Sequence, residues 1–114
     1  MTAPSCGPDE GIDAVRARLG DRWDLCCVLG RGGVVLGTLR PRDLGGEGAT
    51  PARDVMNPAP SSFRPDVPVE ELRRWMGRHP DVPAAPVTSP EGRILGTVSR
   101  SRLDALHLAG TAAG

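Results

Sequence analysis

The apolar residues of the N-terminal half follow first a helical and then an extended period. A helix is predicted between Pro8 and Gly20, with one apolar face made by Ile12, Val15 and Leu19. The continuous apolar run at 25–29 predicts a buried strand. After a glycine-rich turn, the run at 34–39 predicts a second strand that pairs with the first as a hairpin, and Pro41 opens a short helix.

The same succession of patterns returns in the C-terminal half. A second helix is predicted to open at Pro65-Asp66, with inward-facing residues Val69, Leu72 and Met76. Strands at 85–87 and 93–98 form a second predicted hairpin. Ser99 follows as the predicted N-cap of a last helix at 100–108.

The two halves align as internal repeats. Pro8-Asp9 and Pro65-Asp66 are 57 residues apart, whereas Gly37-Thr38 and Gly96-Thr97 are 59 apart. The difference falls in the loop between helix and strand, where insertions are tolerated. The chain is therefore predicted to be an α/β protein of two β-α-β-β-α units, packed sheet to sheet as a pseudo-twofold pair. The predicted parts are a first repeat with a short opening strand, a linker helix, a second repeat and a frayed tail, at 1–46, 47–57, 58–108 and 109–114.

Charge and aromatic content disfavour two classes of partner. The 114 residues carry 14 arginines, no lysine and 14 acidic residues, which argues against a bulk electrostatic grip on nucleic acid or on a membrane. The three aromatic residues that are not histidine, Trp23, Trp75 and Phe63, are too few for a base-stacking surface. The opening residues lack the features of a signal peptide, and no apolar run is long enough to span a bilayer.

The cysteines and histidines show no catalytic or metal-binding spacing. Cys6, Cys26 and Cys27 form no C-x-x-C pair, so we expect reduced thiols and a cytoplasmic protein. Neither His79 nor His107 has a carboxylate or serine placed for catalysis, and we expect neither a metal site nor an enzyme.

Three motifs then suggest a family. These motifs are Asp54-Val55-Met56, Ala85-Pro86-Val87 and Gly92-Arg93-Ile94-Leu95-Gly96-Thr97-Val98-Ser99. Together with the repeat, they make the chain resemble a tandem pair of CBS domains, the regulatory unit called a Bateman module. The resemblance extends from about Cys6 to Leu108, and the first copy departs from the pattern at its brief opening segment.

The resemblance implies ligand contacts at the two corners where a strand leads into a helix. In the family, a Ser or Thr at the corner takes phosphate, and an Asp three residues later binds the ribose hydroxyls. Here the first corner keeps Asp43 but has Arg40 at the hydroxyl position, and the second keeps Ser99 but has Arg102 at the Asp position. The implied ligand contacts are Thr38, Arg40, Asp43, Thr97, Ser99, Arg100 and Arg102. The alternative is that Ser99 only caps a helix, Asp43 pairs with a neighbouring arginine and the arginines are solvated.

The function implied by the resemblance is the sensing of an adenosine-containing ligand: AMP, ADP, ATP, NAD or S-adenosylmethionine. No cofactor is required, and an effector protein would respond to the change in angle between repeats. The alternative is a ligand-independent dimerisation or protein-interaction module with degenerate nucleotide sites. Trp75 lies at the edge of the inward helical face, where the first repeat has Arg18, so Trp75 and Leu72 are predicted to form a homodimer surface. The alternative for Trp75 is packing over the linker or its own repeat.

Overall fold

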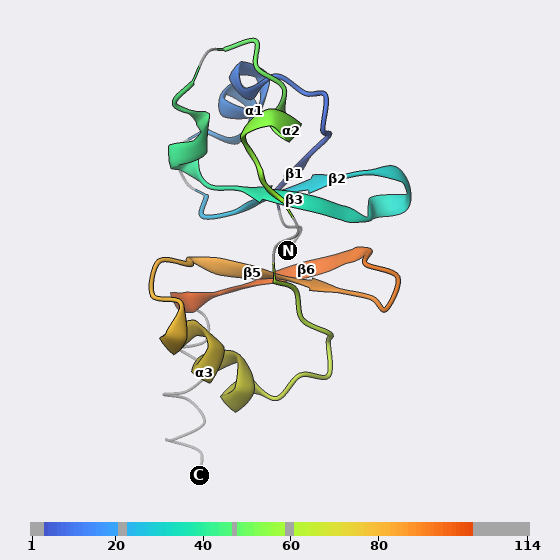
Figure 1. Cartoon of the computed structure of the whole chain (residues 1–114), viewed down its shortest axis with the longest axis vertical. Coiled ribbons are helices and arrows are strands. Elements are labelled where there is room, and N and C mark those ends of the chain that lie inside the picture. The colour runs from blue at the N-terminus through green and yellow to red at the C-terminus, as the bar shows by residue number, and fades with distance from the viewer. Residues whose placement is uncertain (1–3, 21–22, 47, 59–60, 102–114) are drawn as a thin grey trace.

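The computed structural model describes residues 4–20, 23–46, 48–58 and 61–101, and these form two layers that face each other (Figure 1). In each layer a β-sheet lies on the inner side and helices cover the outer side. The sheets meet in the middle, which confirms the predicted α/β fold of two repeats packed sheet to sheet.

The first layer contains a four-stranded sheet in the order β1-β2-β3-β4. β1 runs parallel to β2, and the other neighbours are antiparallel. The strands are β1 (Ser5–Cys6), β2 (Cys26–Leu29), β3 (Val35–Leu39) and β4 (Asn57–Pro58). The helices α1 (Ile12–Leu19) and α2 (Ala52–Val55) cover the sheet, and the 3-10 turns η1 (Arg31–Gly33) and η2 (Pro41–Leu44) follow β2 and β3.

The core of the first layer lies between this sheet and its helices. Its buried members are Cys6, Ile12, Val15, Cys26, Val28, Leu39, Leu44 and Ala52. The predicted inward face of the first helix is confirmed for Ile12 and Val15, which are fully buried, and Leu19 packs at the margin. Each fully buried aliphatic side chain of this size contributes roughly 1.5–3 kcal/mol.

The segment predicted as a linker forms part of the first layer. Ala52 of α2 is fully buried in the first core, and β4 pairs with β3. Gly37 permits this close crossing, because a Cβ atom there would lie 2.5 Å from the Sδ atom of Met56. The connection between repeats is therefore fixed on the first sheet.

The second layer contains a two-stranded sheet covered by one described helix. The strands are β5 (Ala84–Thr88) and β6 (Ile94–Ser99), and the helix is α3 (Val69–Arg78). Leu72 and Met76 are buried against Ala85, as predicted for the inward face. Val69 is 40% exposed, so its prediction as inward-facing was wrong; it is the first residue of α3 and lies before the turn that packs on the sheet.

The two layers also touch at the tips of their hairpins. Val34 and Arg93 form an isolated antiparallel bridge, and the backbone N–H of Val35 donates to the carbonyl of Gly92 at 3.0 Å. Gly92 has a φ of 85°, a conformation that favours glycine. Arg100 and Ser101 continue from β6 with helical backbone, whereas the rest of the predicted helix at 100–108 and the tail at 109–114 lie outside the described residues.

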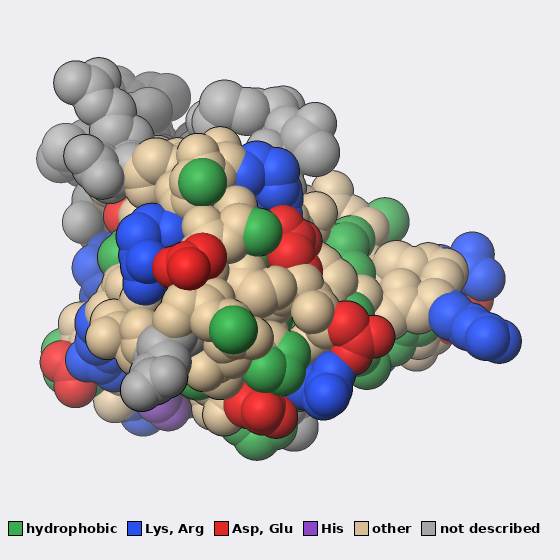
Figure 2. All heavy atoms as spheres, turned by 90° about the horizontal axis from the view of Figure 1, so that it is seen from above, with side chains coloured by type: hydrophobic (Ala, Val, Ile, Leu, Met, Phe, Trp, Pro, Cys, Tyr) green, Lys and Arg blue, Asp and Glu red, His purple; other side chains and the backbone are tan. Residues whose placement is uncertain are grey.

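The outer surface of the first layer carries charges of both signs (Figure 2). Several pair locally, including Arg16 with Asp13 and Arg18 with Glu10, each at 2.9 Å. Among the described helices, none has the length and apolar character needed to cross a bilayer.

Candidate functional site

The two sheets enclose a pocket of about 170 Å³ between them. Side chains alternate along a strand, so the residues next to a core position point to the other face of the sheet. On β3, Leu39 lies in the first core and its neighbour Thr38 therefore points toward the second sheet. On β5, Ala85 lies in the second core, and Ala84 and Pro86 point toward the first. The pocket is thus built where inner faces of both sheets meet.

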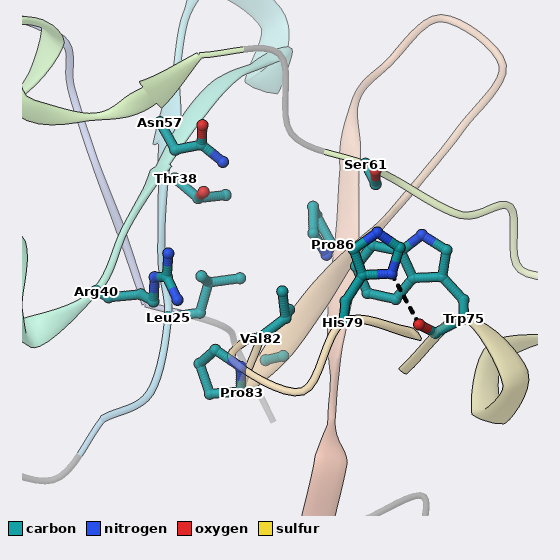
Figure 3. A pocket seen from close by; sticks show the side chains of 11 residues that line it. Leu25, Thr38, Arg40, Asn57, Ser61, Trp75, His79, Val82, Pro83 and Pro86 are labelled. Carbon is teal, nitrogen blue, oxygen red and sulfur yellow. Dashed lines mark hydrogen bonds between the residues drawn. The ribbon is translucent and has the colours of Figure 1, made fainter. Parts of the chain in front are cut away.

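Side chains from four further parts of the chain complete the lining. Leu25, Val82 and Pro83 add apolar surface, and Asn57, Ser61, Arg40 and His79 add polar groups. In Figure 3, Thr38, Asn57 and Arg40 lie across the pocket from Trp75, His79 and Pro86. An apolar pocket with a few convergent polar groups is typical of small-molecule binding sites.

One wall of the pocket is a stack of rings. The imidazole of His79 lies on the indole of Trp75, with centroids 4.2 Å apart and planes 19° apart. Phe63 contacts the indole edge-on at 5.2 Å and holds it from another side. The two stacked rings are four residues apart on successive turns of one helix, so α3 itself positions them.

A hydrogen bond fixes the orientation of the His79 ring. Its Nδ1 atom lies 2.9 Å from the carbonyl oxygen of Trp75, and since a carbonyl only accepts, Nδ1 donates its proton. In the neutral ring, Nε2 is therefore the acceptor. His79 thus offers the pocket a ring face and one nitrogen that accepts a hydrogen bond.

Arg40 brings positive charge to the pocket. Its Nη1 atom donates to the carbonyl of Asp81 at 2.8 Å, a contact that also ties the two repeats together. Within the described part of the chain, Arg40 forms no ion pair with a carboxylate. Because a guanidinium has five N–H donors, this contact leaves donors for an anionic ligand.

A second hollow of about 240 Å³ lies beside Arg40. Trp23 and Arg42 line it, and so do the acidic residues Asp24 and Asp81. No cluster of three or more metal-ligating side chains occurs among the described residues.

The cysteines belong to the packing of the first sheet rather than to this pocket. All three are buried and free. Hydrogen bonding between the Cys6 and Cys26 side chains lowers the pKa of Cys6 and raises that of Cys26. Burial raises the pKa of the Cys27 thiol to about 11. At neutral pH Cys27 is therefore a protonated packing residue.

Comparisons with known proteins match this architecture. Residues 52–106 fit the family model of the CBS domain. The chain is a CBS domain protein. No match was found among curated protein sequences.

Solved structures of CBS domain pairs share the fold of the whole chain. CBSX2 in complex with AMP aligns with a TM-score of 0.83 at 16% identity, covering 96% of this chain and 90% of that one. The CBS domain pair of MJ0100, in complex with 5'-methylthioadenosine and S-adenosyl-L-methionine, has a TM-score of 0.81 at 14% identity, covering 96% and 91%. The cytosolic domain of the Mg²⁺ channel MgtE, in complex with ATP, has a TM-score of 0.81 at 24% identity. Our chain covers 91% of itself but only 44% of that chain, so it spans less than half of that relative.

The first CBS corner brings two of its three predicted ligand residues to the pocket. Thr38 and Arg40 line it. Asp43 is not among the lining residues; its Oδ2 atom accepts the backbone N–H of Arg40 at 2.7 Å. Asp43 thus pairs with the main chain of a neighbouring arginine and closes the turn η2.

The second CBS corner is used differently. Thr97 pairs with Pro86 across the hairpin, and Ser99 directly precedes the helical residues, with its hydroxyl 3.3 Å from that of Ser101. The guanidinium of Arg100 donates to the carbonyls of Met76, His79 and Val82, at 2.6–3.1 Å. Arg100 therefore closes the C-terminal end of α3, and none of these three residues lines the pocket. Arg102 lies outside the described residues.

Sequence reasoning missed five residues of the pocket that lie far apart along the chain. They are Leu25, Asn57, Ser61, His79 and Trp75, the last of which was assigned to another surface. One signal was available, since aromatic rings at positions i and i+4 of a helix lie side by side.

Proposed function

We propose that this CBS domain protein binds an adenosine-containing nucleotide in the pocket between its two repeats. The observation that carries the proposal is the combination of an aromatic wall, Trp75 and His79, with the guanidinium of Arg40 in one pocket. A purine ring gains from contact with aromatic faces, and phosphate oxygens match the fork of an arginine. The related structures were obtained with AMP, ATP and S-adenosyl-L-methionine, which supports this class of ligand.

The chemistry of the pocket supports binding rather than catalysis. Its hydroxyl and imidazole groups are Thr38, Ser61 and His79, and the described part of the chain has no carboxylate positioned to orient the imidazole. We therefore propose a regulatory module, not an enzyme. Ligand binding would favour one angle between the two repeats, and a partner would respond to that angle.

Thermal unfolding with a panel of AMP, ADP, ATP, NAD and S-adenosylmethionine tests the proposal. A ligand at 100 times its dissociation constant stabilises the native state by about 2.7 kcal/mol. We expect AMP to raise the melting temperature by several degrees, at roughly 4–8 °C per kcal/mol for a small domain. An unchanged melting temperature with every compound at millimolar concentration would contradict nucleotide binding.

Arg40 is the residue to change in a second test. We expect Arg40→Gln to weaken AMP about tenfold or more, because it removes a charge-assisted hydrogen bond. Adenosine, which has no phosphate, should bind both proteins alike. Arg42→Gln is the matched control, since Arg42 lies nearby but does not line the pocket. Equal losses for both variants would show that the pocket does not hold the phosphate.

The alternative function is a ligand-independent dimerisation or interaction module. It is favoured by the two incomplete corners, where Asp43 closes a turn and Arg100 closes a helix. In this case the whole panel would leave the melting temperature unchanged while association persisted.

A homodimer in the cytoplasm remains part of the proposal. Leu72 is only 4% exposed, and Trp75 contacts Phe63 and His79 of its own repeat, so neither presents its full side chain to a second copy. Val69 is the more exposed apolar residue of α3. In sedimentation at tens of micromolar, we expect a dimer that Val69→Asp weakens and Leu95→Asp, on the hairpin, does not. A monomeric wild type would contradict the dimer.

A further inference from the structure

The Asp43 carboxylate is held in the turn that follows β3. Its Oδ2 atom accepts the backbone N–H of Arg40 at 2.7 Å, and its own backbone N–H donates to the carbonyl of Arg40 at 2.8 Å. These two hydrogen bonds form a closed ring that begins the turn η2. Releasing the carboxylate toward a ligand would leave the Arg40 N–H without its acceptor.

The pocket itself offers neutral polar groups and one guanidinium. Thr38, Asn57 and Ser61 supply hydroxyl and amide groups, and Arg40 supplies the charge. Within the described part of the chain, no carboxylate lines this pocket. The acidic residues Asp24 and Asp81 lie instead at the neighbouring hollow.

These two observations bear on how a sugar is recognised. A carboxylate binds a pair of vicinal hydroxyls through charge-assisted hydrogen bonds, which are roughly twice as strong as neutral ones. Without a carboxylate, the loss of one hydroxyl from the sugar removes at most a neutral hydrogen bond. Discrimination between ribose and deoxyribose is then small.

We propose that the pocket does not select ribonucleotides over 2'-deoxyribonucleotides. The inference rests on the proposed function and specifies its ligand class: a purine nucleotide recognised through its base and its phosphate. Asp43 serves the backbone of the turn, and the 2'-hydroxyl contributes little to affinity.

Calorimetric titration of the full chain with AMP and with dAMP tests this inference. We expect the two dissociation constants to differ by less than about fivefold, as for the loss of one neutral hydrogen bond. The informative variant is Asp43→Asn, because an asparagine oxygen still accepts the Arg40 N–H and preserves the turn. We expect this variant to bind AMP as the wild type does. Melting temperatures of the two proteins verify that the turn is intact.

The outcomes separate this inference from the proposed function. AMP binding more than tenfold tighter than dAMP would overturn the inference and leave the nucleotide site in place. A loss of AMP affinity in Asp43→Asn, with an unchanged melting temperature, would overturn it as well. If neither nucleotide binds at millimolar concentration, the proposed function fails and the inference fails with it.

Discussion

Val34 and Arg93 form an isolated antiparallel bridge, and they occupy the same position in the two repeats, 59 residues apart. The pseudo-twofold axis therefore passes between the two hairpins at this bridge. Equivalent residues further along the hairpins should have equivalent surroundings wherever the symmetry is kept. Gly37 and Gly96, also 59 residues apart, reveal where it is broken.

We predict that Gly37→Ala destabilises the protein and Gly96→Ala does not. A Cβ atom at Gly37 would lie 2.5 Å from the Met56 Sδ atom and 2.8 Å from the carbonyl oxygen of Asn57, whereas nothing lies within 4 Å of a Cβ atom at Gly96. Overpacking of this kind costs about 1–3 kcal/mol. Urea unfolding of both variants measures the difference. Equal stabilities would show that β4 does not cross over β3 at this point.

The repeat and its layers could be predicted from the sequence because they depend on local patterns. Apolar periodicity located the helices and strands, and the matching offsets placed both sheets in one fold. The crossing at Gly37 could not be predicted in this way, since it depends on where the connection between repeats returns to the sheet. Val69 was misplaced for a related reason: a helical face says which residues align, but not at which residue the helix begins.

Arg100 is predicted to stabilise the fold without contributing to ligand affinity. Its guanidinium satisfies the carbonyls of Met76, His79 and Val82, which no longer have helical partners at the end of α3. We expect Arg100→Gln to cost about 2 kcal/mol of unfolding free energy. AMP affinity, measured at a temperature where the variant is folded, should be unchanged. Retained stability with weakened AMP binding would indicate that Arg100 contacts phosphate, as the family resemblance implied.

Trp75 is predicted to report ligand binding through its fluorescence. A base that enters the pocket would lie against the Trp75–His79 wall and change the surroundings of the indole. The sequence has two tryptophans, and Trp23 lies outside this pocket. We expect AMP to quench the fluorescence of the wild type and of Trp23→Phe equally, and to leave that of Trp75→Phe unchanged. A signal that disappears in Trp23→Phe instead would place the ligand at the neighbouring hollow.

Stability is predicted to fall at alkaline pH because of Cys27. Its thiol has a pKa raised to about 11 in the folded protein, so between pH 9 and 11 the unfolded chain loses a proton that the folded chain keeps. The unfolding free energy should therefore be fully present below pH 9 and fall by about 1.4 kcal/mol per pH unit through this window. The absence of lysine and tyrosine keeps the titration simple.

Urea unfolding at several pH values compares the wild type with Cys27→Ala. The variant lacks this proton, so its stability should fall less steeply between pH 9 and 11. Cys6 and Cys26 remain in both proteins and cancel in the comparison. Parallel pH profiles would show that the Cys27 thiol ionises as readily in the folded state as in the unfolded chain.

The binding site was predicted only in part, for reasons that lie in its construction. Thr38 and Arg40 could be found because they belong to a corner that the family motif marks. Leu25, Asn57 and His79 come together only when the two sheets face each other, which no local pattern encodes. The role of Asp43 depends on a single backbone N–H, and residue type alone does not reveal that partner.

The most direct test of a nucleotide site between the repeats is an NMR titration of the ¹⁵N-labelled chain with AMP. We predict that shift changes gather at the indole N–H of Trp75 and at the backbone amides of Thr38, Arg40 and Ala84, which line the pocket from both repeats. The amide of Gly20, at the outer end of α1, serves as the internal control and should not move. Shift changes confined to one repeat or clustered around Trp23 and Asp24, or a spectrum unchanged at millimolar AMP, would contradict the site.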